Sequence, residues 1–145
     1  MSDKINPFEK KKKGVFFFKS SNPYEFYDLL NGKNMDDKQD VWGTLIFPEN
    51  AKKPCPLIIP IHGSAGLREG HHTHMVNLLD AGFAIFRIHH FESRGVISIV
   101  ENQTEVTLAS MITDAFRALT LVSKHPDVDS DKIGIMGWSL GGSTA

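Results

Sequence analysis

The residues with the clearest chemical potential form a five-residue motif near the end of the sequence. Gly137-Trp138-Ser139-Leu140-Gly141 reads G-x-S-x-G, a pattern that raises a serine hydroxyl on a sharp turn between a strand and a helix. The two glycines leave room for that turn, because larger side chains would collide across it. The motif predicts Ser139 as a nucleophile that attacks a carbonyl carbon, and the alternative is a glycine-rich turn with an incidental serine.

A second segment could complete the same chemistry. His62–Gly66, with the sequence HGSAG, follows the apolar run Leu57–Ile61. Acyl transfer places negative charge on the former carbonyl oxygen, and two backbone N–H groups stabilise it. Leu140, directly after the serine, is expected to supply one N–H, and Ser64 the other, with Ala65 as the alternative. The histidine and glycine that open the segment could also simply end the strand.

Short apolar runs precede both segments, so a sheet is expected to carry them. Most of these runs are continuous rather than alternating, which is typical of strands buried on both faces. Helical patterns separate the later runs, and this alternation predicts an α/β fold with a mostly parallel sheet and flanking helices. The four expected strands are Val41–Phe47, Leu57–Ile61, Phe83–Ile88 and Lys132–Met136.

The first expected helix lies before the Phe83–Ile88 strand. Met75, Leu78 and Leu79 fall on one helical face. Gly82 follows at the position where a glycine in the left-handed conformation ends a helix. The pattern therefore predicts a helix that stops just before this glycine.

The second expected helix is longer and has a regular apolar face. Asn102 is predicted as its N-cap with Glu105 three residues later, and His125-Pro126 is expected to end it. The spacings of four, three, four and three place one side of this helix against the sheet. The residues at these spacings are Leu108, Ile112, Ala115, Leu119 and Val122.

Length and composition favour one ordinary globular domain. The 145 residues carry 41% hydrophobic and 23% charged side chains, and the net charge of −1 lacks the basic excess of a nucleic-acid-binding protein. Cys55 is the single cysteine, so neither an intramolecular disulfide nor a cysteine metal site is expected. No apolar stretch is long enough for a membrane span, and a soluble, cytoplasmic protein is expected.

The first forty residues differ in composition from the rest. Residues 1–40 are polar and turn-rich. They are predicted to form an irregular N-terminal region with one strand at Val15–Lys19 and one short helix within Tyr24–Leu30. The alternating pattern occupies residues 41–145.

The order of these segments resembles the dienelactone hydrolase-like branch of the α/β-hydrolase family. The resemblance is carried by the strand Leu57–Ile61, the loops His62–Gly66 and Phe91–Val96, the strand entry Val128–Ile133 and the elbow Gly137–Gly142. It implies an α/β-hydrolase-type sheet that stops after the elbow strand. Residues 41–145 would then be the N-terminal part of the hydrolase domain.

The same resemblance implies an activity. Ser139 would be the nucleophile of an enzyme that cleaves small-molecule carboxylic esters or lactones through an acyl-enzyme, without metal or organic cofactor. Dienelactone hydrolases proper use cysteine at this position. The serine therefore favours a broader carboxylesterase-like activity.

The partners that activate such a serine are not at the expected place. In this family an acidic residue and then a histidine follow the nucleophile, but the six residues after Ser139 include neither. His62, His89 and His90 end predicted strands and are the candidates for a substitute base. We expect the N-terminal part of a longer hydrolase that is inactive alone; the alternative is a non-catalytic fragment that binds an acyl ligand or a complementary chain.

Other residues suggest further roles. His71 and His74 could hold a metal ion, although a solvated helix start is the plainer interpretation. Arg94 could anchor a substrate carboxylate or stabilise a loop. The lysine-rich segment Lys10–Lys13 is expected to be a solvated terminus. An apolar strand at Lys132–Met136 would leave an open sheet edge, through which self-association is expected.

Overall fold

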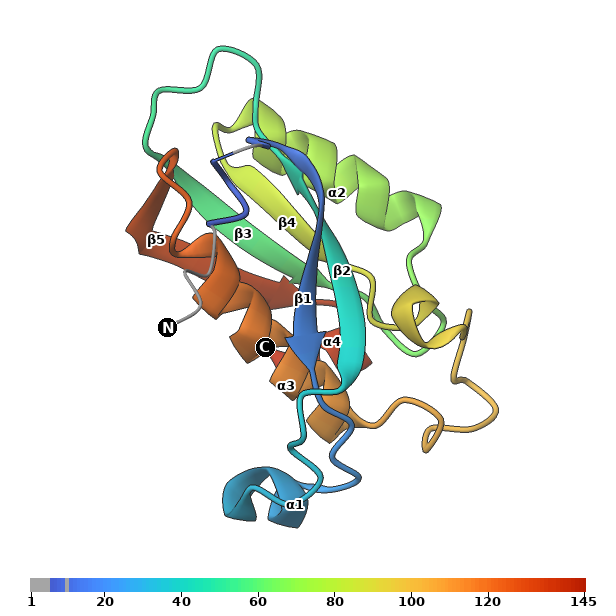
Figure 1. The fold of residues 1–145 in the computed structure, drawn as a ribbon. Helices are drawn as coiled ribbons and strands as arrows, with labels where there is room; N and C mark the ends of the chain where they lie inside the picture. Colours follow the sequence, from blue (N-terminus) through green and yellow to red (C-terminus); the bar gives the residue numbers. More distant parts are fainter. Residues whose placement is uncertain (1–5, 10) are drawn as a thin grey trace.

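A five-stranded sheet organises the chain. The computed structural model describes residues 6–9 and 11–145. The strands are arranged in the order β1-β2-β4-β3-β5 (Figure 1). Their bounds are β1 Gly14–Ser20, β2 Gln39–Ile46, β3 Cys55–Ile61, β4 Ala84–Ile88 and β5 Val128–Gly137.

The sheet is mixed rather than parallel throughout. The strands β3, β4 and β5 run parallel, which confirms that part of the prediction. In contrast, β2 is antiparallel to β4, and β1 is antiparallel to β2. The segment 47–54 between β2 and β3 is too short for the helical crossover that joins parallel strands. The chain therefore reverses direction before it enters the parallel part.

The predicted strands are confirmed with shifted ends. In β3, Leu57, Ile59 and Ile61 are buried on one face, while on the other face Ile58 is half-buried and Pro60 is buried, so both faces are covered most fully toward the end of the strand. The largest difference is in β5, which begins at Val128 rather than at Lys132. Val128 pairs with Cys55, and a register shift separates this pair from the rest of the ladder.

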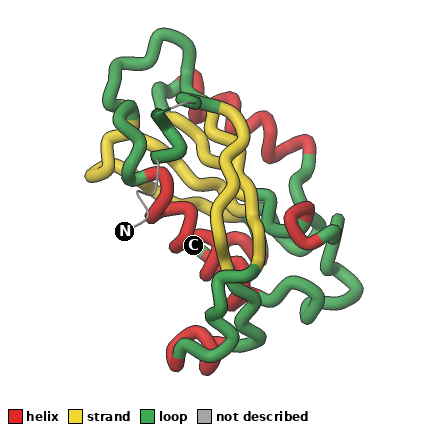
Figure 2. The backbone as a smooth tube through the Cα atoms, in the orientation of Figure 1, coloured by secondary structure: helices red, strands yellow, loops and turns green. Residues whose placement is uncertain are grey.

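Helices cover both faces of the sheet (Figures 1 and 2). On one side lies α2, Glu69–Asp80, and on the other lie α3, Leu108–Val122, and the short α4, Leu140–Thr144. The end of α2 agrees with the sequence prediction. Gly82 has φ +93° and its N–H donates to the Leu79 carbonyl, while the Phe83 N–H donates to that of Leu78. This pair of bonds closes the helix.

The start of α3 differs from the prediction. Thr107, not Asn102, is the N-cap, and its Oγ1 accepts a hydrogen bond from the Ser110 N–H at 3.1 Å. The Asn102 side chain instead accepts one from the Thr104 N–H in a local turn. Asparagine and threonine both cap helices, but helical geometry begins only after Thr107. Thr107 also donates to the Pro23 carbonyl, which ties the N-terminal region to α3.

This correction can be tested by two alanine substitutions. We expect Thr107→Ala to lower the free energy of unfolding by about 1 kcal/mol, because the Ser110 N–H loses its acceptor. Asn102→Ala should leave it nearly unchanged. Urea unfolding followed by far-UV circular dichroism measures both. A larger loss for Asn102→Ala than for Thr107→Ala would contradict the assignment.

Sheet edges and the N-terminal region complete the fold. The predicted strand near Val15–Lys19 is β1, which forms one edge, and the short helix is α1, Phe26–Asn31. The opposite edge is β5, which among the described residues pairs only with β3. Self-association through this edge stays a prediction. No described helix is long and apolar enough to cross a bilayer.

Candidate active site

Ser139 sits in a strained turn between β5 and α4. Its backbone has φ 54° and ψ −119°, a region that residues other than glycine rarely adopt. Such a conformation costs on the order of 1–3 kcal/mol and persists only where the surroundings enforce it. The side chain is exposed at the end of β5. The G-x-S-x-G motif thus forms the sharp strand-to-helix turn that its sequence predicts.

Two glycines make this turn possible. A Cβ on Gly137 would lie 2.0 Å from the Gly141 carbonyl oxygen, and one on Gly141 would lie 2.1 Å from that of Ile61. Both distances are far below van der Waals contact. Gly137 lets the turn close on itself, whereas Gly141 lets α4 approach the end of β3.

The loop after β3 lies directly against the serine. A Cβ built on Gly63 would be 3.2 Å from the Ser139 Cβ and 3.0 Å from the Trp138 carbonyl oxygen. In addition, the Trp138 N–H donates to the Ile61 carbonyl at 3.1 Å. The structure therefore brings together the two segments that the sequence singled out.

Backbone N–H groups remain free beside Ser139. Those of Leu140, Ser64 and Ala65 donate no hydrogen bond to any residue that the structure describes. By contrast, the Gly63 carbonyl accepts from the Gly66 N–H at 3.0 Å and from His62 Nδ1 at 2.9 Å. Because a peptide group is planar, bonds to this carbonyl also fix the direction of the Ser64 N–H. Ser64 and Ala65 both stay candidates for the second donor.

A neighbouring loop, missed by the sequence reasoning, supports Ser64. The Ser64 carbonyl accepts hydrogen bonds from the Ile99 N–H at 2.8 Å and the Ser98 Oγ at 3.3 Å. The Ser64 Oγ donates to Gln103 Oε1 at 3.3 Å. These bonds join residues more than thirty positions apart in sequence, and no local spacing indicates them.

His62 is buried inside the loop rather than paired with Ser139. It is 3% exposed, its Nδ1 donates to the Gly63 carbonyl, and its Nε2 is buried without a partner among the described residues. Burial, and then the neighbouring His90, lower the pKa of His62 to about 4. The imidazole is therefore neutral at pH 7 and shapes the loop.

This pKa gives a pH-dependent stability. The folded chain holds the His62 proton less tightly than the unfolded chain, whose histidine titrates near 6.5. Stability from this group is complete above about pH 6.5 and is lost as the pH falls toward 4. We expect a loss of about 3 kcal/mol across this window. Urea unfolding at several pH values should show a smaller loss in His62→Gln, and an equal loss in both proteins would contradict the assignment.

The two other candidate bases also point elsewhere. His89 forms a hydrogen bond with Thr44 at 2.9 Å and stacks on Trp42. His90 is fully buried and its Nδ1 donates to Asp114 Oδ2 at 2.8 Å. Within residues 6–9 and 11–145, no imidazole forms a hydrogen bond with the Ser139 hydroxyl.

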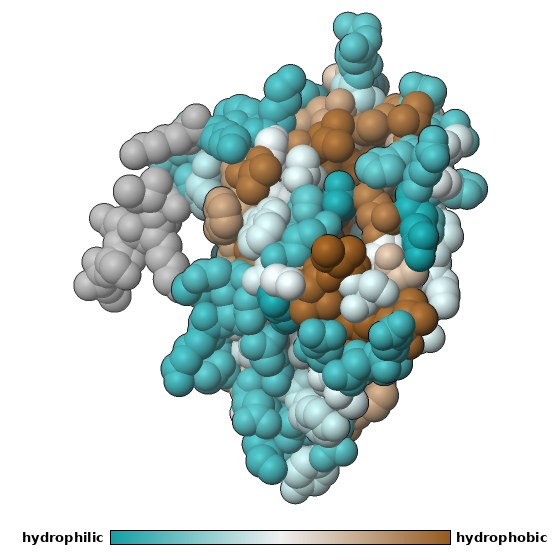
Figure 3. Space-filling model, turned by 90° about the vertical axis from the view of Figure 1, so that its right-hand side faces the viewer, coloured by the Kyte–Doolittle hydropathy of each residue, from teal (hydrophilic) through white to brown (hydrophobic). Residues whose placement is uncertain are grey.

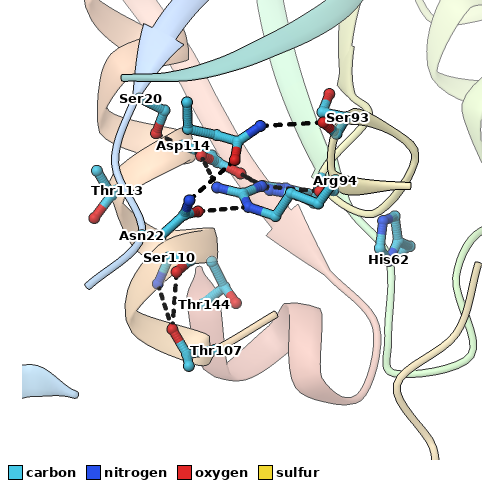
Figure 4. A network of polar contacts seen from close by, with 12 residues as sticks. Ser20, Asn22, His62, Ser93, Arg94, Thr107, Ser110, Thr113, Asp114 and Thr144 are labelled. Carbon is cyan, nitrogen blue, oxygen red and sulfur yellow. Dashed lines mark hydrogen bonds and ion pairs between the residues drawn. The ribbon is translucent and has the colours of Figure 1, made fainter. Parts of the chain in front are cut away.

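Arg94 stabilises a loop instead of facing a substrate site. Its guanidinium donates to both oxygens of Asp114, at 2.8 and 3.0 Å, and its Nε donates to Asn22 (Figure 4). Ser20 Oγ donates to the same carboxylate at 2.5 Å. Burial alone raises the pKa of Asp114, but the hydrogen bonds from His90 and Arg94 outweigh it and hold the pKa below its ordinary value. This network joins the end of β1, the loop after β4 and α3.

The histidines at the start of α2 pack against the elbow. His71 stacks on Trp138 with ring centroids 4.3 Å apart, and His74 lies 5.9 Å from the same ring. His71 Nδ1 also accepts a hydrogen bond from the Arg68 N–H. Across the described residues, no group of three or more histidine, cysteine or acidic side chains could hold a metal ion. His71 and His74 therefore pack on Trp138, the residue directly before Ser139.

Comparisons with known proteins agree with this architecture. The family model BD-FAE matches residues 44–145. A comparison with curated proteins gives no match. Among solved structures, Est1E from Butyrivibrio proteoclasticus with bound ferulic acid is similar at 27% identity and a TM-score of 0.57, over 72% of this chain and 41% of its own.

Two more distant structures share the fold. The dienelactone hydrolase-like promiscuous phosphotriesterase P91 from metagenomic libraries is 18% identical with a TM-score of 0.60, over 90% of this chain and 52% of its own. A glucuronoyl esterase from Solibacter usitatus is 21% identical with a TM-score of 0.54, over 74% and 39%. The expected likeness to dienelactone hydrolase-like α/β-hydrolases is confirmed, and the chain spans about half the length of the structures that it matches.

Proposed function

Since the chain belongs to the BD-FAE family, we propose that it forms part of a serine hydrolase that cleaves carboxylic esters or lactones. The observation that carries the proposal is the strained backbone of Ser139, which holds its hydroxyl beside free N–H groups at the start of α4 and in the loop after β3. One similar structure is named as a glucuronoyl esterase, and another, Est1E, holds ferulic acid. Both names support chemistry at an acyl group.

The proposed reaction passes through an acyl-enzyme. Ser139 Oγ attacks the ester carbonyl carbon and loses its proton to a general base. The oxygen of the tetrahedral intermediate accepts hydrogen bonds from the Leu140 N–H and from that of Ser64 or Ala65. The alcohol then leaves with a proton, and water releases the acid by the same steps.

This mechanism needs a general base in addition to the groups that the described residues supply. The chain supplies the nucleophile and the N–H donors, but no described imidazole contacts Ser139. We propose that the acid and histidine of the triad lie beyond residue 145, in keeping with the greater length of the matched structures. Residues 1–145 alone would then bind an acyl group without turnover.

A fluorophosphonate probe tests the assignment. We expect it to label Ser139 in the protein made from its natural coding sequence, and to label nothing in Ser139→Ala. Ser143→Ala, which removes a nearby serine of α4, is the matched control and should label normally. Residues 1–145 alone should react on the order of 10⁴-fold more slowly, because the base is absent.

The other outcomes separate the candidate functions. Label on a residue other than Ser139 would overturn the nucleophile assignment. Absence of label in the protein from the natural coding sequence would favour the non-catalytic fragment that binds an acyl ligand or a complementary chain.

A further inference from the structure

A cavity of about 190 Å³ opens beside the loop that carries Ser64. Its walls are the loop residues 65–67, Ile97 and His72, together with an ion pair between Arg87 and Glu92. This part of the surface lies on the side of α2 and of the 3₁₀ turn Glu92–Arg94, where hydrophobic and hydrophilic residues adjoin (Figure 3). The cavity plays no part in the mechanism above.

The cavity lies next to the proposed reaction centre. It begins at Ala65, the neighbour of Ser64, and Gly63 of the same loop packs against Ser139. Ile97 lines it and is tied to this loop, because its carbonyl oxygen would be 2.7 Å from a Cβ on Gly66. The cavity and the proposed N–H donors of Ser64 or Ala65 therefore belong to the same loop.

The ion pair gives the cavity a donor and an acceptor. Arg87 Nη2 donates to Glu92 Oε1 at 3.1 Å, and of the five guanidinium N–H groups only this one reaches a described residue. The neighbouring His89, whose Nδ1 lies 3.6 Å from Glu92 Oε1, is the main reason that the pKa of Glu92 falls to about 2. The carboxylate is consequently ionised at neutral pH, and its Oε2 accepts no hydrogen bond from the described residues.

The charges of this pair select a neutral ligand. A carboxylate or phosphate would be attracted by Arg87 but repelled by Glu92, and an ammonium group the reverse, so a charged ligand gains little net attraction from the pair. A hydroxyl can accept from the guanidinium and donate to the carboxylate at once. Ala65, Leu67 and Ile97 offer the apolar surface that carbon atoms of the same ligand would cover.

We propose that this cavity binds a hydroxyl substituent of the substrate, so that hydroxyl-bearing esters are the preferred substrates. The inference rests on the proposed function, because it takes the ester carbonyl to lie beside Ser139. Arg87 and Glu92 are assigned as residues that determine specificity and take no part in bond cleavage.

Binding can be measured without turnover in the Ser139→Ala variant. The probes are two matched pairs: methyl 3-hydroxybutyrate with methyl butyrate, and 2-hydroxyethyl butyrate with ethyl butyrate. Nuclear magnetic resonance follows the Arg87 guanidinium and the amides of Ala65, Gly66 and Ile97. We expect at least one hydroxy ester to shift these signals and to bind about tenfold more tightly than its partner.

Two variants keep the result interpretable. Arg87→Met and Glu92→Ala should each abolish the preference for the hydroxy ester, whereas Glu105→Gln, away from this cavity, should retain it. Equal binding within both pairs, or shifts confined to other residues, would overturn the inference. The proposed function has its own test: it fails if fluorophosphonate does not label Ser139. Selective binding of the hydroxy ester at Arg87 would still be observed in that case, so the two failures are distinguishable.

Discussion

Replacing Gly137 by alanine is expected to lower the free energy of unfolding by more than about 3 kcal/mol. The new Cβ would lie 2.0 Å from the Gly141 carbonyl oxygen and 2.5 Å from the Gly142 nitrogen. Both are backbone atoms, so relief requires the turn itself to open. Fluorophosphonate labelling of Ser139 should be lost together with stability, because the same turn holds the hydroxyl in place.

Gly142→Ala is the matched control for this prediction. Its Cβ would lie 3.4 Å from the Gly137 carbonyl oxygen, which is ordinary contact, and the position is helical. We expect unfolding to change by less than about 1 kcal/mol. Circular dichroism during urea unfolding compares the two proteins. Equal stability of Gly137→Ala and Gly142→Ala would show that the turn is not closed in the way described.

Asp114→Asn is expected to cost about 3–5 kcal/mol of stability, because it leaves the Arg94 guanidinium, which is largely buried, without its countercharge. The side chains of His90 and Ser20 would lose the same acceptor. The expected result is a lower midpoint of urea unfolding with the slope retained.

An exposed carboxylate provides the comparison for this variant. Asp40 pairs with Lys19 at 2.7 Å, but both side chains are more than half exposed. We expect Asp40→Asn to change stability by less than about 1 kcal/mol. Adding Arg94→Met to Asp114→Asn should recover part of the loss, since no charge is then left buried alone. A small effect of Asp114→Asn would mean that water reaches this network.

The sequence predicted the elements that depend on local pattern. Continuous apolar runs located β3 and β4, and Gly82 located the end of α2, because both signals act within a few residues. Gly137 is a local requirement too, because its Cβ would collide with the backbone of Gly141 and Gly142. Gly141, by contrast, avoids the carbonyl oxygen of Ile61, which lies far earlier in the sequence at the end of β3.

Features that depend on distant partners were not predictable. Whether Arg94 faces a substrate or a loop depends on Asp114, twenty residues later on a helix that packs against β1. The antiparallel pairing of β2 follows from the length of its connection to β3. The support of Ser64 by Ile99 also joins loops that no periodicity relates.

The stacking of His71 on Trp138 gives the molecule an optical reporter at the elbow. The sequence has two tryptophans, and each lies against a different imidazole: Trp42 on the face of β2, and Trp138 beside Ser139. A Trp42→Phe variant would leave one indole, whose emission responds to the ring beneath it. Fluorescence of that variant would reveal, in real time, ligands that arrive next to the serine.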